Sequence, residues 1–138
     1  MIKAKDIMTK DIVSVKRDTP VYEAVELLAE NDITGMPVVE DDMTLLGVIS
    51  EKDVLRLFYA DEEEKNKPVE FFMTQPAACY DENDSLQKIC DFMMINHFRR
   101  VPVISKEGKV VGIVSRPDLV KYILQLRRAE TAGLTRSK

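Results

Sequence analysis

The chain has 138 residues, with 20 basic and 24 acidic side chains, so its formal net charge is −4. This length is typical of one compact domain, and it is long enough to bury a hydrophobic core without disulfides or metals. An apolar fraction of 45% and a charged fraction of 32% exclude wholesale disorder. The acidic balance argues against nucleic-acid polymers as partners, because neutralising phosphates requires a basic surface.

The N-terminus and the two cysteines favour a cytoplasmic location. Residues 1–15 carry charges in every turn, which fits neither a signal peptide nor a spanning helix. No apolar run approaches the roughly 18 residues that a membrane span requires. Cys79 and Cys90 are accompanied by a single His, so we expect no metal site and two reduced thiols rather than a disulfide.

An internal repeat emerges when the sequence is shifted by 65 residues. The shift superimposes identical residues without a gap: Met8-Thr9 on Met73-Thr74, Asn31 on Asn96, Pro37-Val38 on Pro102-Val103, Gly47 on Gly112, Ser50 on Ser115 and Asp53 on Asp118. Such a period indicates two copies of one structural unit. We therefore predict a first repeat over 1–60, a charged linker over 61–67, a second repeat over 68–125 and a polar tail over 126–138.

Both copies show the same order of predicted elements. In the first, an apolar stretch at 12–15 precedes a helix that begins with Thr19 as N-cap and Pro20 in its first turn. Two short strands at 36–39 and 45–49 follow, and then a helix after Ser50. The second copy has a capping-box sequence at Ser85, strands at 101–104 and 110–114, and a helix after Ser115. Each copy alone would expose one face of its sheet, so the two should pack together.

Gly47 and Gly112 interrupt good strands at equivalent positions. A strand glycine leaves no side chain to pack and often marks a bulge or the close approach of a ligand. It can equally provide a gap that the packing of the two sheets requires. Both interpretations remain open from the sequence.

Each closing helix begins with the pattern Ser-x-x-Asp, at 50–53 and at 115–118. A Ser at the N-cap with an acidic residue three positions later is a capping box, and this structural role is the more common one. A functional role is compatible with it, since a carboxylate at that place can accept hydrogen bonds from the hydroxyls of a ribose. The free N–H groups of a helix N-terminus also attract anions.

The copies differ in charge around this pattern. The second has Arg99 and Arg100 opposite Thr34 and Gly35 of the first, and its Arg116 stands where the first has a glutamate. Three arginines near one helix start are either surface ion pairs or an anion site, because guanidinium groups bind phosphate oxygens in bidentate fashion. Glu51 makes the first copy less hospitable to phosphate. No nucleophile accompanies His97, and no acid–base pair is apparent, so we do not expect an enzyme.

The repeat and its Gly-h-h-Ser-x-x-Asp ends, where h is apolar, closely resemble a tandem pair of cystathionine-β-synthase-type (CBS) domains, also called a Bateman module. The resemblance covers about residues 3–125. It implies an α+β fold in which two β-α-β-β-α repeats pack through their sheets as a pseudo-twofold pair, with the helices outside. Two clefts would lie between the repeats.

Proteins of this family bind AMP, ADP, ATP or S-adenosylmethionine in such clefts, as regulatory ligands rather than required cofactors. The resemblance places Asp118 at the ribose hydroxyls and Ser115 with Arg116 near the phosphate, with Arg99 and Arg100 as further basic contacts. In the main cleft it places the purine base of the ligand near Met8, Asp11, Val13, Ile33, Thr34 and Gly35. The second cleft would use Asp53 and Ser50, with Ala78, Phe98 and Arg99 near the base.

The resemblance implies a regulatory module for energy sensing, which acts on an effector protein that the sequence does not identify. Such modules commonly form homodimers through exposed helices. The apolar faces available for this are formed by Val54, Leu55, Phe58, Leu119, Ile123 and Leu124. These residues could instead pack only on their own sheets. The alternative function is an interaction or dimerisation module whose clefts bind no ligand.

Overall fold

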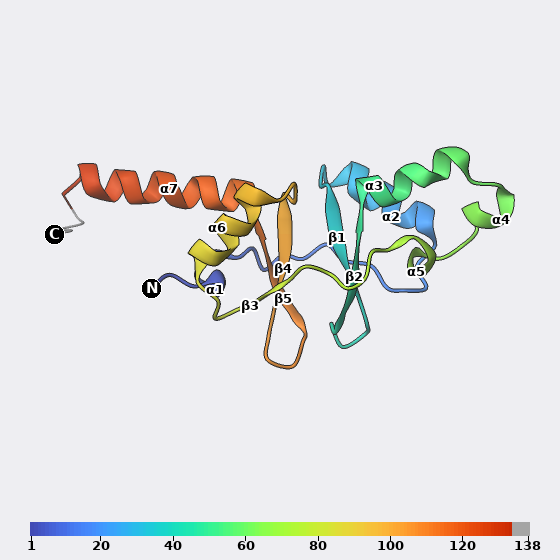
Figure 1. Cartoon of the computed structure of the whole chain (residues 1–138), viewed down its shortest axis with the longest axis horizontal. Helices are drawn as coiled ribbons and strands as arrows, with labels where there is room; N and C mark the ends of the chain where they lie inside the picture. The colour runs from blue at the N-terminus through green and yellow to red at the C-terminus, as the bar shows by residue number, and fades with distance from the viewer. Residues whose placement is uncertain (134–138) are drawn as a thin grey trace.

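The computed structural model describes residues 1–133 and shows two sheets at the centre with helices outside (Figure 1). The first sheet pairs β1 (Gly35–Val39) with β2 (Leu45–Ser50) in antiparallel fashion. The second contains β3 (Tyr80–Asp81), β4 (Arg100–Ile104) and β5 (Val110–Ser115), with β3 parallel to β4. The remaining elements are α1 (Ala4–Ile7), α2 (Val21–Glu30), α3 (Glu51–Val54), the 3-10 helix η1 (Leu55–Tyr59), α4 (Glu62–Lys65), α5 (Val69–Phe72), α6 (Leu86–Ile95) and α7 (Arg116–Thr131).

The α+β fold, the two repeats and the four long strands are confirmed. Two details of the first repeat differ from prediction. The apolar stretch at 12–15 reaches the sheet only through one parallel bridge, between Val15 and Val38, where the second repeat forms β3. The N-cap of α2 is Pro20, because the hydroxyl oxygen of Thr19 accepts a hydrogen bond from the N–H of Lys16 instead of from the helix.

The segments between and after the repeats also have local structure. The linker contains a separate helical turn, α4, whose N-cap Asp61 accepts a hydrogen bond from the N–H of Glu64. α7 continues to Thr131, six residues into the segment predicted as a polar tail, and extends away from the body of the molecule (Figure 1). The rest of that predicted tail from 134 onward lies outside the described residues.

The tips of the two hairpins pair with each other at equivalent positions of the repeat. Thr44 forms an antiparallel bridge with Lys109, and these two residues superimpose under the shift of 65. The N–H of Leu45 donates to the carbonyl of Gly108 at 3.1 Å, and the N–H of Val110 donates to the carbonyl of Met43 at 2.9 Å. A residue that pairs with its own equivalent lies on a twofold axis, so the pseudo-twofold axis passes between Thr44 and Lys109.

Each repeat gives its first short helix to the other repeat. Ala4 of α1 is fully buried in a cluster with Leu86 and Ile89 of the second repeat. In return, Val69 and Phe72 of α5 are buried in the core of the first repeat. Figure 1 shows α1 beside α6 and α5 beside α2, each far in sequence from its neighbour. Because each core contains side chains of both copies, neither repeat has a complete core alone.

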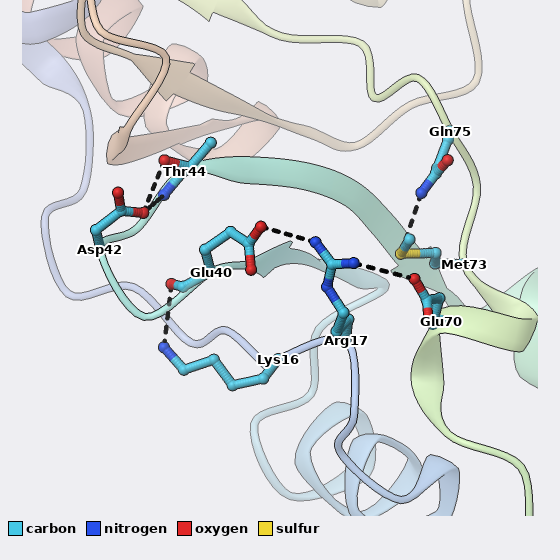
Figure 2. Close-up of polar contacts among 8 residues, drawn as sticks. All are labelled: Lys16, Arg17, Glu40, Asp42, Thr44, Glu70, Met73 and Gln75. Atoms are coloured by element: carbon cyan, nitrogen blue, oxygen red, sulfur yellow. Dashed lines mark hydrogen bonds and ion pairs between the residues drawn. The ribbon is translucent and has the colours of Figure 1, made fainter.

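Polar contacts hold α5 in this exchanged position. The guanidinium of Arg17 donates to Glu40 at 2.7 Å and to Glu70 of α5 at 3.4 Å (Figure 2). A backbone hydrogen bond also joins α5 to the first repeat, since the N–H of Val69 donates to the carbonyl of Thr19 at 2.8 Å. Arg17 therefore joins the hairpin of the first repeat to a helix that belongs, by sequence, to the second.

The exchanged segments explain the two strand glycines. A Cβ added at Gly47 would lie 2.6 Å from the backbone carbonyl oxygen of Thr74, which follows α5. A Cβ added at Gly112 would collide with the side chain of Met8, which follows α1. The glycines thus provide the gap through which the chain itself crosses the strands, and packing rather than a ligand accounts for them.

We expect Gly47→Ala to destabilise the protein by about 1–3 kcal/mol, because the new methyl group meets a backbone atom that cannot move independently. Gly112→Ala should cost less, since the flexible Met8 side chain can turn away. The free energy of unfolding in urea measures both variants. Equal losses, or no loss for Gly47→Ala, would show that the crossing segment is not held tightly.

Candidate ligand-binding clefts

The two Ser-x-x-Asp patterns form the capping boxes that the sequence predicts. Oδ2 of Asp118 accepts hydrogen bonds from the N–H and the hydroxyl of Ser115, both at 2.9 Å. Oδ2 of Asp53 accepts the same two from Ser50, at 2.9 and 3.0 Å. These contacts fix each carboxylate at the start of its helix, between the end of a strand and the first helical turn.

The Thr of the repeated Met-Thr pair lies in the segment that crosses from the other repeat, and its hydroxyl donates a further hydrogen bond to each carboxylate. The hydroxyl of Thr9 donates to Oδ1 of Asp118 at 3.3 Å, and that of Thr74 donates to Oδ1 of Asp53 at 3.0 Å. Thr9 and Asp118 belong to different repeats, as do Thr74 and Asp53. Each acidic site is therefore built jointly by the two copies.

The remaining hydrogen-bonding capacity lies on Oδ1. An ionised carboxylate offers about four lone-pair sites. Oδ2 of Asp118 accepts two hydrogen bonds from Ser115 and a long one, at 3.5 Å, from the hydroxyl of Thr9, while Oδ1 accepts only from Thr9 among the residues that the structure describes. Asp53 has the same pattern with Ser50 and Thr74. Each half-buried carboxylate can thus accept a further hydrogen bond from a ligand hydroxyl.

The main cleft, at Asp118, is the smaller of the two, with a volume of about 150 Å³. Its walls are Thr9, Asp11, Val13, Asn31, Ile33, Gly35, Pro37, Arg100, Ile113, Ser115 and Asp118. The second cleft, at Asp53, has a volume of about 370 Å³. It is lined by Thr34, Gly35, Val48, Ser50, Lys52, Asp53, Thr74, Pro76, Ala77, Ala78, Phe98, Arg99, Arg100 and Pro102.

The structure gathers many of the predicted site residues into these clefts. In the main cleft it places Asp118, Ser115, Arg100, Asp11, Val13, Ile33 and Gly35. In the second cleft it places all five residues that the resemblance implies there, which are Asp53, Ser50, Ala78, Phe98 and Arg99. Thr34, which the resemblance implies for the main cleft, lies in the wall of the second, and Arg99, implied for both clefts, lines only the second. Met8 contacts the strand at Gly112 and is not part of either wall.

Arg116, for which the resemblance implies a place near the phosphate, is bound to the end of another helix. Its Nη2 donates to the carbonyl oxygens of Met93 and Asn96, each at 3.1 Å, at the end of α6. These carbonyls have no partner inside the helix, so the guanidinium caps α6 from the first turn of α7. Arg116 joins two helices and lines neither cleft.

Arg100 lies between the two clefts and contributes to both walls. Its Nε is buried and has no hydrogen-bond partner among the described residues. Burial lowers the pKa of the Arg100 guanidinium, and the nearby Asp118 carboxylate opposes this effect. An unpartnered buried donor costs free energy, so this group favours a ligand that can accept its hydrogen bond.

Some wall residues were not expected as ligand contacts. Thr9 and Thr74 were visible as a repeated motif, but their hydrogen bonds to the aspartates depend on the exchange of segments. The sequence does not identify Lys52 as a cleft residue. It is adjacent to Glu51, and only the direction of α3 decides which of the two side chains lines the second cleft. Asn31 and Ile113 of the main cleft had no signal beyond the repeat itself.

Comparison with known families agrees with the geometry. Residues 4–60 and 69–125 each match the CBS domain. The chain belongs to the CBS domain family. Its two copies form a tandem CBS pair, as the resemblance implied.

Individual relatives of this CBS pair have different lengths. Inosine-5'-monophosphate dehydrogenase of Methanocaldococcus jannaschii is 30% identical over 119 residues, which are 86% of this chain but only 23% of that enzyme. The crystal structure of CBSX2 from Arabidopsis thaliana in complex with AMP is 33% identical, with a TM-score of 0.82, and the match covers 92% of this chain and 99% of that one. AcuB from Vibrio cholerae shares the fold, with a TM-score of 0.85 at 24% identity over 96% of this chain and 97% of that one.

Other features of the CBS pair bear on its chemistry. Cys79 and Cys90 are free, half-buried thiols, and burial together with Asp84 raises the pKa of Cys79. Within residues 1–133 there is no group of His, Cys, Asp and Glu side chains arranged to hold a metal ion. The same part of the chain has no helix that is long and apolar enough to cross a membrane.

We expect Arg116→Met to lower the free energy of unfolding by about 1–3 kcal/mol, because it leaves two carbonyls at the end of α6 without their donor. Lys121→Met removes the same charge from an exposed position of α7 and serves as the matched control. Urea unfolding of both variants is the measurement. Equal stability of the two would contradict the capping role of Arg116.

Proposed function

We propose that this CBS pair is a regulatory module that binds an adenosine-containing ligand between its repeats. The observation that carries the proposal is the pair of aspartates, each fixed by a Ser and a Thr and each with an open acceptor on Oδ1. CBSX2, which shares 33% of its sequence with this chain over nearly its full length, was solved with AMP. The ligand classes are AMP, ADP, ATP and S-adenosylmethionine.

In this proposal the ribose hydroxyls donate to Asp118 in the main cleft and to Asp53 in the second. The purine lies against the apolar walls, which are Val13 and Ile33 in one cleft and Ala78 with Phe98 in the other. Phe98 suits this role because the residue is 49% exposed and its ring is stacked on Phe92, with 5.4 Å between the ring centroids. A ligand held this way contacts both repeats and changes how firmly they pack.

The module acts through that change on an effector protein and has no catalytic role of its own. In this proposal the module is an energy sensor, and its input is the adenine-nucleotide pool. Neither wall contains a histidine, and the hydroxyls of Ser115 and Ser50 are engaged in capping Asp118 and Asp53. Binding rather than turnover is therefore the proposed output.

Thermal unfolding with each of the four ligands at millimolar concentration tests the proposal. A ligand at about a hundred times its dissociation constant adds roughly 2.7 kcal/mol to the stability of the folded state, so the midpoint should rise by several degrees. Asp53→Asn and Asp118→Asn should reduce the rise, and the double variant should abolish it. Glu107→Gln, an exposed change on a hairpin tip, is the control. If no ligand raises the midpoint of the unaltered protein, the proposal is wrong.

We also propose that the module forms a homodimer through its exposed helices. Of the six apolar residues named for this role, Val54 and Leu119 pack into the cores of their own repeats. Leu55, Phe58, Ile123 and Leu124 are 56%, 83%, 61% and 45% exposed. Phe58 and Ile123 superimpose under the shift of 65, so the two exposed faces are related by the pseudo-twofold axis. The same faces favour the alternative function, an interaction module without a ligand.

Sedimentation velocity of Phe58→Glu/Ile123→Glu tests this surface, since two buried charges should split a dimer into monomers. Tyr22→Glu, on the exposed side of α2, should leave the mass unchanged. A monomeric unaltered protein would contradict the dimer, and a double variant that remains dimeric would place the interface elsewhere.

A further inference from the structure

The two clefts of this CBS pair carry opposite charge. Lys52, Arg99 and Arg100 face the second cleft together with one acid, Asp53. Arg100 faces the main cleft with two acids, which are Asp11 and Asp118. The side chains thus give a formal charge of 3 − 1 = +2 in the second cleft and 1 − 2 = −1 in the main one.

The repeat shows where this difference originates. Under the shift of 65, Lys52 of the second cleft corresponds to Pro117, and Arg99 corresponds to Thr34. Pro76 in the wall of the second cleft likewise corresponds to Asp11 in the wall of the main cleft. Each of these three sequence differences makes the second cleft more positive than the main cleft, while the strands and capping boxes are the same in both repeats.

The basic side chains of the second cleft are not engaged elsewhere. Within residues 1–133, neither Lys52 nor Arg99 has a carboxylate oxygen within 4.0 Å of its charged nitrogens. Arg100 has a buried Nε that lacks a hydrogen-bond partner in the same part of the chain. Arg116, by contrast, is occupied by the carbonyls of α6. An anion in the second cleft would therefore meet three available donors.

The second cleft also has the larger space. Sites for small organic ligands commonly measure about 300–1,000 Å³, a range that includes its 370 Å³ but not the 150 Å³ of the main cleft. It adjoins a hollow of about 450 Å³, and both share Lys52 and Arg99 in their walls. From the sequence, Glu51 is expected to disfavour phosphate binding in this cleft. In the structure it lines the outer hollow and not the second cleft itself.

We infer that the second cleft is the polyphosphate-selective site, in which Lys52, Arg99 and Arg100 bind the phosphates of a nucleoside di- or triphosphate. The inference rests on the proposed binding of an adenosine ligand and assigns its phosphates to one cleft. The acidic main cleft discriminates against those phosphates, since Asp11 and Asp118 would repel them. The two copies of the repeat have therefore diverged into sites of different ligand charge.

Isothermal titration with ATP, adenosine and inorganic tripolyphosphate tests the inference on the full chain. Lys52→Gln and Arg99→Gln should each weaken ATP binding roughly tenfold or more, because each removes a charged donor to phosphate. Tripolyphosphate binding should weaken in parallel, while the affinity for adenosine should change less than twofold. Lys121→Gln removes one positive charge from an exposed position of α7 outside both clefts and should bind ATP as the unaltered protein does.

The possible failures are distinguishable. If ATP binds, is unaffected by Lys52→Gln and Arg99→Gln, and is lost in Asp118→Asn, the phosphates lie in the main cleft: the inference is then wrong and the proposed function stands. If Lys121→Gln weakens ATP as much as Arg99→Gln does, the effect is general electrostatics, which also overturns the inference. If neither ATP nor adenosine binds at millimolar concentration, the inference is wrong. The proposed function fails with it only if AMP, ADP and S-adenosylmethionine also do not bind.

Discussion

The passage of the chain across the strands at Gly47 and Gly112 determines how the two repeats are joined. At each crossing the exchanged segment lies so close to a strand that a single methyl group would collide with it. The crossing allows α1 and α5 to complete the core of the opposite repeat. It also brings Thr9 to Asp118 and Thr74 to Asp53. Core packing and construction of the acidic sites are thus consequences of the same exchange.

Because each cleft is made from both copies, a ligand in either cleft is coupled to the packing between them. A molecule that hydrogen-bonds to Asp53 and contacts Arg99 joins residues from different repeats. It stabilises the paired arrangement without needing a hinge or a lid. Phe58 lies on η1, which directly follows the capped helix α3, and Ile123 lies on the capped helix α7. A change in packing at the clefts can therefore reach the surface through short, direct connections.

Local patterns were sufficient to predict much of this architecture. The period of 65 residues identified two copies, and the apolar runs with their polar turns located β1, β2, β4 and β5 within one residue at each end. The Ser-x-x-Asp patterns predicted both capping boxes. These features depend on neighbours in the sequence, so spacing and residue type define them.

Local sequence patterns do not predict contacts between segments that are far apart in the chain. α1 and α5 have four residues each, too few to show a helical period, and their exchange between repeats leaves no local trace. Arg116 was grouped with Arg99 and Arg100 because they share a charge, yet its partners are carbonyls at the end of another helix. Lys52 and Glu51 are adjacent, and only the direction of α3 decides which one lines the second cleft. The net charge of each cleft therefore follows from the three-dimensional structure and not from local sequence patterns.

A crystal structure of the protein grown with ATP would show directly which cleft binds the phosphates. We expect density for a nucleotide in the second cleft, with ribose hydroxyls at Asp53 and phosphates within hydrogen-bonding distance of Lys52, Arg99 and Arg100. A nucleotide bound only at Asp118, or a second cleft without density at saturating ATP, would contradict this expectation.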